Sequence, residues 1–139
     1  MYQLSQIKAE VNKLAKLIGA NQHQLPTYGR SRDLGYTHVE VDENFYHLVC
    51  VERGGELERN STSDFNELLY LIFSDATFDI ASNYEVKNRI ENQDSRRLLF
   101  KKQIDLMYSI NSKFGQKLET EITKVLDEHP FKDNRSNGA

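Results

Sequence analysis

The sequence is poor in cysteine and contains a single residue of this type, Cys50, among 139. One cysteine cannot form a disulfide within the chain. Cys50 stands between Val49 and Val51, and a thiol in such an apolar, β-branched segment is typically buried and reduced. It also lacks the electropositive setting that activates a nucleophile. We therefore expect no redox or thiol chemistry from this residue.

Long apolar runs are also absent. The apolar residues are scattered and the mean hydropathy is −0.67, so we expect no membrane-spanning segment. Near the start of the chain, Lys8, Glu10 and Lys13 separate the apolar positions, unlike the apolar centre of a secretory signal. These features predict a soluble, cytoplasmic protein, and the length favours a single domain over residues 1–131. Residues 132–139 have nothing to bury and are expected to form a flexible tail.

The motifs of nucleotide-dependent and hydrolytic enzymes are missing as well. Gly29, Gly35, Gly54 and Gly55 fit neither spacing of the phosphate-binding glycine loops, and none of them opens a helix after a strand. No serine stands in a nucleophile-elbow sequence. The sequence therefore predicts a protein without a cofactor and disfavours a nucleotide-dependent enzyme.

Charge is unevenly distributed along the chain. Residues 38–85 contain eleven acidic and two basic residues, whereas the segments before and after them are both net basic. A concentrated negative segment disfavours nucleic-acid binding, which needs clustered Lys and Arg, and it suits a basic protein partner. Alternatively, the basic flanks fold over the acidic segment and neutralise it internally.

The spacing of apolar residues predicts four helices. Apolar positions recur at steps of three and four residues, and Gly19 follows the first helix as a left-handed cap. Asp64 is the expected cap of the second helix, with Thr62 or Ser63 as alternatives, and Asp94 is the expected cap of the third. The expected ranges are Leu4–Ile18, Phe65 to about Tyr84, Ser95–Ile110 and Ser112 to about His129. Apolar residues nearly encircle the second helix, so we expect it at the centre of the core.

Alternating, β-branched residues predict three strands, with a long loop before them at residues 20–37. The expected strands are His38–Val41, Phe45–Glu52 and Leu57–Asn60, joined by a polar turn and by a turn whose positive backbone angles come from Gly54 and Gly55. The predicted fold class is therefore α+β, a three-stranded antiparallel β-meander packed against about four helices.

The length of the first turn decides which polar side chains share a face. The favoured three-residue turn, Asp42–Asn44, puts His38 and Glu40 on one face and His47 on the other. A two-residue turn would bring these three residues and Asp42 together. The enzyme alternative is a small metal-dependent hydrolase that uses His38, Glu40 and His47. We favour a cross-strand polar cluster or a recognition patch, without a metal.

Asp75 and Asp79 lie one helical turn apart. Unpaired like charges at this spacing destabilise a helix by about 0.2–0.5 kcal/mol, so the pair is expected to have a compensating cation. We expect Arg89, Arg96 or Arg97 to supply it. The alternatives are a general acid–base pair and a cation that belongs to a partner.

The chain carries an ordered set of short motifs. They are Ile18-Gly19, the Leu-Pro-Thr-Tyr-Gly loop with a following Asp in Leu25–Asp33, the strand His38–Val41, the Tyr-His strand closing in Glu-Arg-Gly over Tyr46–Gly54, and the helix Asp64–Phe73. As a set they resemble the immunity protein 63 family, small bacterial proteins that neutralise the toxins of polymorphic toxin systems. Arg96-Arg97 and His129–Phe131 are also similar. The chain departs from the family pattern in having no Trp, since Leu71 and Phe114 stand where relatives carry it.

This resemblance implies a non-catalytic protein that inhibits a cognate toxin domain by binding it. Tyr and Arg are enriched in interface hot spots, so the loop and the acidic residues of the meander form the predicted partner-binding surface. Its residues are Tyr28, Arg30, Asp33, Glu40, Asp42, Glu43, Glu56 and Glu58. Two alternatives stay open: Tyr28 and Asp33 are internal struts of an ordered loop, or the chain is an adaptor domain.

Overall fold

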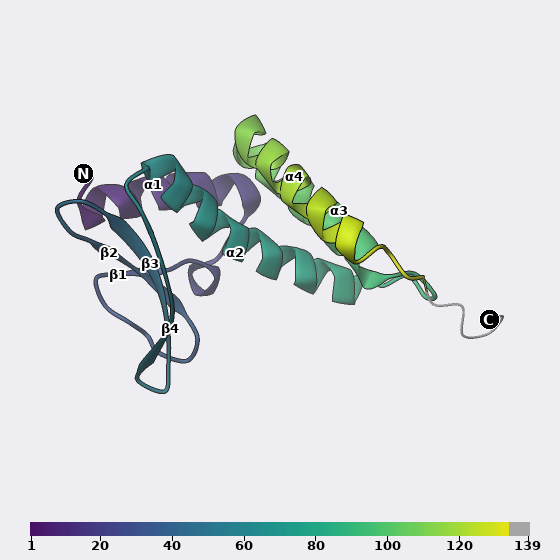
Figure 1. Cartoon of the computed structure of the whole chain (residues 1–139), viewed down its shortest axis with the longest axis horizontal. Coiled ribbons are helices and arrows are strands. Elements are labelled where there is room, and N and C mark those ends of the chain that lie inside the picture. Colours follow the sequence, from purple (N-terminus) through teal and green to yellow (C-terminus); the bar gives the residue numbers. More distant parts are fainter. Residues whose placement is uncertain (134–139) are drawn as a thin grey trace. The chain divides into compact units, whose positions relative to one another are not determined.

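The computed structural model describes residues 1–133 and has the α+β class that the sequence predicts (Figure 1). The chain forms two compact units, one over Met1–Ala76 and a second that begins at Thr77. The boundary falls inside helix α2 (Phe65–Lys87). The first unit contains α1 (Leu4–Ile18), the 3-10 turn η1 (Gln22–Gln24), the sheet and the start of α2.

The sheet has four strands in the order β1-β2-β3-β4, and the prediction of three strands is therefore wrong by one. The strands are β1 (Thr27–Tyr28), β2 (Thr37–Val41), β3 (Tyr46–Glu52) and β4 (Gly55–Thr62). The extra strand, β1, pairs with β2 in parallel. Two residues between Pro26 and Gly29 are too few to show an alternating pattern, which is why β1 reads as loop in the sequence.

The turn between β2 and β3 differs from the favoured prediction. The Asp42 N–H donates to the Phe45 carbonyl at 3.0 Å, so Glu43 and Asn44 alone form the turn. The Asp42 carboxylate stabilises this geometry because its Oδ1 accepts from the N–H groups of Asn44 and Phe45. The three-residue turn is wrong, and the two-residue alternative gives the observed register.

The turn between β3 and β4 is also shifted by one residue. Positive φ angles occur at Arg53 (54°) and Gly54 (74°), whereas Gly55 is already paired with Glu52 in the sheet. Two successive left-handed residues are typical of the tight hairpin turn whose twist matches that of the flanking strands. The prediction of Gly54 and Gly55 as the turn residues is thus half right, and Arg53 takes up the strained backbone conformation.

The core of the first unit lies between the sheet and the two helices. Leu48 and Tyr46 belong to the sheet face that meets α1 and α2, and the Tyr46 ring packs on Phe65 with centroids 5.7 Å apart. The predicted central helix contributes Leu68, Ile72 and Phe73, whose exposed fractions are 0–1%. Asp64 caps this helix as expected, since its side chain accepts the N–H of Asn66.

The second unit contains the end of α2 and the hairpin of α3 (Ser95–Ile110) and α4 (Ser112–Glu128), whose ranges agree with the prediction. Only Asn111 separates α3 from α4, and its side chain accepts the N–H of Phe114 to cap α4. The helices approach closely at Gly115, where a Cβ would lie 2.3 Å from the Tyr108 ring.

The C-terminal end of the described chain returns to the start of α3. The Lys132 N–H donates to Asp94, and Asp133 accepts the Asp94 N–H and pairs with Arg97. Residues 134–139 of the predicted flexible tail lie outside the described residues. The single domain over residues 1–131 stays a prediction. Within residues 1–133, no helix combines the length and the apolar character needed to cross a bilayer.

Candidate functional site

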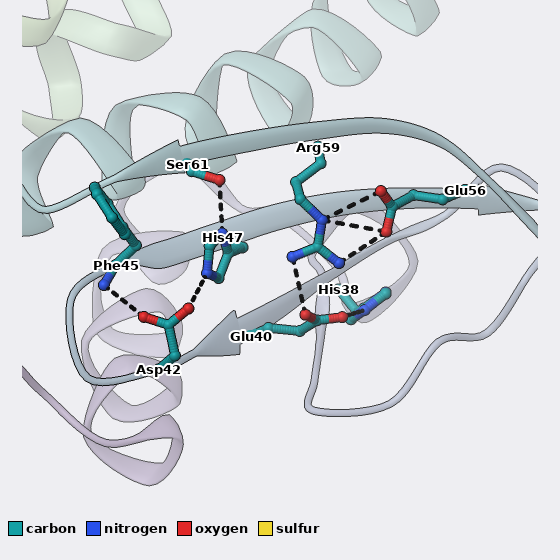
Figure 2. A network of polar contacts seen from close by, with 8 residues as sticks. All are labelled: His38, Glu40, Asp42, Phe45, His47, Glu56, Arg59 and Ser61. Carbon is teal, nitrogen blue, oxygen red and sulfur yellow. Dashed lines mark hydrogen bonds and ion pairs between the residues drawn. The ribbon is translucent and has the colours of Figure 1, made fainter.

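One face of the sheet lies away from the helices and carries a set of polar side chains. In Figure 2, α1 and α2 lie behind the sheet and these side chains project in front of it. We call this surface the open face; its polar residues are His38, Glu40, Asp42, His47, Glu56, Arg59 and Ser61. The two-residue turn creates it, because Glu40 then pairs with His47 directly across β2 and β3.

Arg59 organises the larger of two polar clusters on the open face (Figure 2). Its guanidinium lies 3.0 Å from Glu40 Oε1 and 2.7 Å from Glu56 Oε1. The other oxygen of Glu40 lies 2.7 Å from His38 Nε2. These hydrogen bonds, first the one with His38 and then that with Arg59, lower the pKa of Glu40. Both carboxylates are therefore held ionised and fixed in orientation.

This cluster also covers an apolar residue of the sheet. Val49 pairs with His38 on β2 and with Arg59 on β4, and it is completely buried. An arginine side chain can bury its methylene stem while its charged end stays in contact with solvent. Arg59 and His38, as the cross-strand neighbours of Val49, therefore help to shield it from solvent.

The second cluster lies beside the turn between β2 and β3. His47 Nε2 lies 2.7 Å from Asp42 Oδ2, and His47 Nδ1 lies 2.6 Å from the Ser61 hydroxyl. The hydrogen bond with His47, aided by the backbone N–H groups of Asn44 and Phe45, lowers the pKa of Asp42 to about 2. Asp42 is thus charged at neutral pH, and Phe45, which follows it across the turn, has an exposed ring.

The two clusters are poorly arranged for the metal-dependent alternative. His38, Glu40 and His47 do share a face, but Nε2 of each histidine is already bonded to a carboxylate. The remaining nitrogen of His38, Nδ1, is buried and has no hydrogen-bond partner. Among residues 1–133, no three His, Cys, Asp or Glu side chains are grouped so that they could hold a metal ion.

The loop between β1 and β2 is held by contacts at several points. Arg32 Nη2 donates to the Leu25 carbonyl at 2.7 Å, and the guanidinium stacks 4.1 Å from the centre of the Tyr36 ring. Asp33 accepts the N–H of Gly54 in the β3–β4 turn. The Tyr28 hydroxyl is buried without a partner, and burial raises the pKa of Tyr28 to about 12. These contacts agree with the strut alternative for Tyr28 and Asp33.

The tip of the same loop combines backbone strain with apolar exposure. Asp33, Leu34 and Gly35 have φ angles of 56°, 59° and 79°, so three successive residues are left-handed. This conformation costs a non-glycine residue roughly 1–2 kcal/mol. Leu34 pays this cost although its side chain is 77% exposed and contributes little to the core. Strained, exposed apolar residues of this kind are common at binding sites.

The eight predicted surface residues do not all lie together. Glu40, Asp42 and Glu56 share the open face. Glu43 lies in the adjoining turn between β2 and β3. Arg30 is exposed on the loop. Glu58 pairs with Cys50 and lines the opposite face, towards α2.

Sequence reasoning missed Arg59, which fixes two of the acidic residues, and the exposed apolar residues Leu34, Phe45 and Leu57. The alternation of β4, had it been aligned with the correct turn, would have put Arg59 beside Glu40. Leu34 has no sequence signal of its own apart from its place before Gly35 in a polar loop.

The arginines that were expected to compensate Asp75 pair elsewhere. Arg89 binds Glu85, Arg96 binds Asp94, and Arg97 binds Asp133, with distances of 2.7–2.9 Å. Glu85 belongs to the acidic segment 38–85, and Arg89 from the basic segment that follows neutralises it. Each of the three guanidiniums therefore has a carboxylate other than Asp75 as its partner.

Comparison with known protein families gives a match over more than half of the chain. The family model described as immunity protein 63 matches residues 42–124, which include β3, β4, α2, α3 and most of α4. No curated protein and no solved structure shows significant similarity to the chain. The matched range contains the Asp42, His47, Glu56 and Arg59 side chains of the open face.

Proposed function

This chain belongs to the immunity protein 63 family, and we propose that it binds a cognate bacterial toxin domain and thereby neutralises it. Inhibition by binding needs no catalytic group, which agrees with the bonded state of both histidines on the open face. The proposed place of action is the cytoplasm.

The proposed binding surface is based on the oriented carboxylates of the open face. Glu40 and Glu56 are oriented by Arg59, and Asp42 is oriented by His47. Carboxylates that are already ordered lose little conformational freedom when a partner cation arrives. We therefore propose a basic partner surface, with Glu43 and Arg30 at the margin and Tyr28 and Asp33 acting by holding the loop.

Exposed apolar side chains complete this proposed surface. Leu34, Phe45 and Leu57 are 77%, 45% and 63% exposed. Such residues, surrounded by charged groups, are typical of protein interfaces, in which apolar contacts govern dissociation and charges speed association. Glu58 lies on the other face of the sheet and is not part of this surface.

Co-expression tests the function itself. The toxin domain encoded beside the gene of this chain should arrest growth when it is expressed alone and should be tolerated when this chain is co-expressed. The purified proteins should form a complex whose association rate falls by about tenfold between about 0.05 and 0.5 M NaCl, because salt screens charge attraction. Absence of both protection and complex formation would refute the proposal.

Two variants test the surface without disturbing the fold. Glu43→Gln removes an exposed charge and should slow association, whereas Leu34→Ala should speed dissociation by roughly tenfold. Glu10→Gln on α1 is the matched control for the lost charge. Wild-type kinetics in both surface variants would show that the toxin binds another part of the chain.

A further inference from the structure

A small cavity lies on the other side of the sheet, between β2–β4 and the start of α2. Its volume is about 200 Å³, and its lining includes Leu48 and Cys50 from β3, Glu58 and Asn60 from β4, and Leu71 and Asp75 from α2. All of these residues belong to the first compact unit. The cavity therefore combines an apolar wall, from the two leucines, with carboxylates that come from two different elements.

The two carboxylates lie close enough for the charge of Glu58 to act on Asp75. Within residues 1–133, neither Glu58 nor Asp75 forms an ion pair; Glu58 only accepts a hydrogen bond from Asn60, at 2.8 Å. Desolvation, reinforced by the negative charge of Glu58, raises the pKa of Asp75 to about 6. Burial first, and then the charges of Glu58, Asp75 and Glu52, raise the pKa of the Cys50 thiol. Asp75 and Cys50 thus both lie within the field of the Glu58 carboxylate.

We propose that this cavity receives the side-chain cation of one lysine or arginine from the partner protein. The inference rests on the proposed function for the identity of the partner. Leu48 and Leu71 would contact the methylene stem, while Glu58 and Asp75 bind the charged end. β4 is an edge strand of the sheet, and it carries Glu56 on the open face as well as Glu58 in the cavity. A partner that lies along β4 can therefore contact both.

Cys50 makes the cavity testable without the partner, because it is the one cysteine of the chain. Methanethiosulfonate reagents react when the thiolate attacks their sulfenyl sulfur, forming a mixed disulfide and releasing methanesulfinate. A trimethylammonium reagent and a sulfonate reagent of similar size measure the local potential as the ratio of their rates. Any change in the intrinsic reactivity of the thiol affects both rates equally and cancels in their ratio. The rates of both reagents with 2-mercaptoethanol correct the ratio for the difference in reactivity between the reagents.

The corrected ratio at pH 8 and low salt should favour the cationic reagent by about tenfold, and it should fall severalfold in Glu58→Gln and in Asp75→Asn. Glu10→Gln, which removes a carboxylate outside the cavity, should leave it unchanged. A ratio near one in the wild-type protein, or an equal fall in Glu10→Gln, would overturn the inference.

Partner binding tests the occupant. Asp75→Asn and Glu58→Gln should weaken the toxin complex by roughly tenfold or more, and modification of Cys50 by the cationic reagent should block it. Unchanged affinity in both variants would refute the docking of a partner side chain, even if the reagent ratio shows that the cavity attracts cations. In that case the cavity would bind a free cation. Failure of the wild-type chain to bind the toxin would refute the proposed function instead, and the reagent ratio would still measure the cavity.

Discussion

Asp33 accepts the N–H of Gly54 with both carboxylate oxygens, at 3.2 Å each. The contact joins the loop before β2 to the turn between β3 and β4, and it satisfies an N–H that the tight turn leaves outside the sheet. Asp33→Ala should lower the free energy of unfolding by about 1 kcal/mol, measured by urea denaturation. Asp33→Asn keeps one acceptor oxygen and should lose less. Equal stability of the alanine variant and the wild type would mean that Asp33 is no strut.

Tyr28 offers a second test of the loop. Its hydroxyl is buried without a partner, so Tyr28→Phe should leave the free energy of unfolding unchanged or raise it by up to about 1 kcal/mol. The absorbance titration of tyrosinate should lose one group that ionises near pH 12. Tyr28→Ala removes the ring as well and should lower the melting temperature. Weaker toxin binding per folded molecule in the alanine variant would instead make Tyr28 a contact residue.

Replacing Asp75 should stabilise the folded chain in a pH-dependent way. Its pKa is raised from 3.8 to about 6 in the folded chain, so the folded state disfavours the charged form and loses stability as the pH rises between these values. Asp75→Asn should therefore be more stable than the wild type above pH 6, and this difference should vanish near pH 4. Because Asp75 is also exposed to solvent, the gain is on the order of 1 kcal/mol or less. Melting curves of both proteins across this range measure it, and a constant difference would argue against burial of this carboxylate.

Gly115 tests the helical hairpin of the second unit. A Cβ at this position would lie 2.3 Å from the Tyr108 ring, so Gly115→Ala should destabilise the chain by about 1–3 kcal/mol despite its better helix propensity. Adding Tyr108→Ala removes the ring and should recover part of the loss, which a double-mutant cycle would reveal. A more stable Gly115→Ala variant would mean that α3 and α4 do not approach closely here.

The helices could be predicted from the sequence because their signals are local. The apolar stripe of α1 ends at Ile18, and Gly19 follows with a φ of 66°. Asp94 caps α3 through a hydrogen bond to the N–H of Arg96. Each of these signals lies within one helical turn of the boundary that it defines.

The sheet was harder to predict because single residues decide its register. Asp42 bonds to the N–H groups of Asn44 and Phe45, which shortens the turn by one residue and moves His47 to the face of Glu40. Arg59 reaches Glu40 only through this register, and β1 joins the sheet with only two residues. The acidic residues and histidines of the candidate site could therefore be singled out in the sequence. Which of them lie together could be known only from the register in which the strands pair.

The order of the strands bears on how the first unit folds. Each strand of the β1-β2-β3-β4 sheet pairs with its neighbour in the sequence. Forming the sheet thus requires the closure of short loops only, and the entropy of loop closure grows with loop length. Chains whose contacts are local in sequence fold faster than those that join distant segments. A newly synthesised chain can therefore pair the strands of this sheet one after another as it emerges, before α2 is complete.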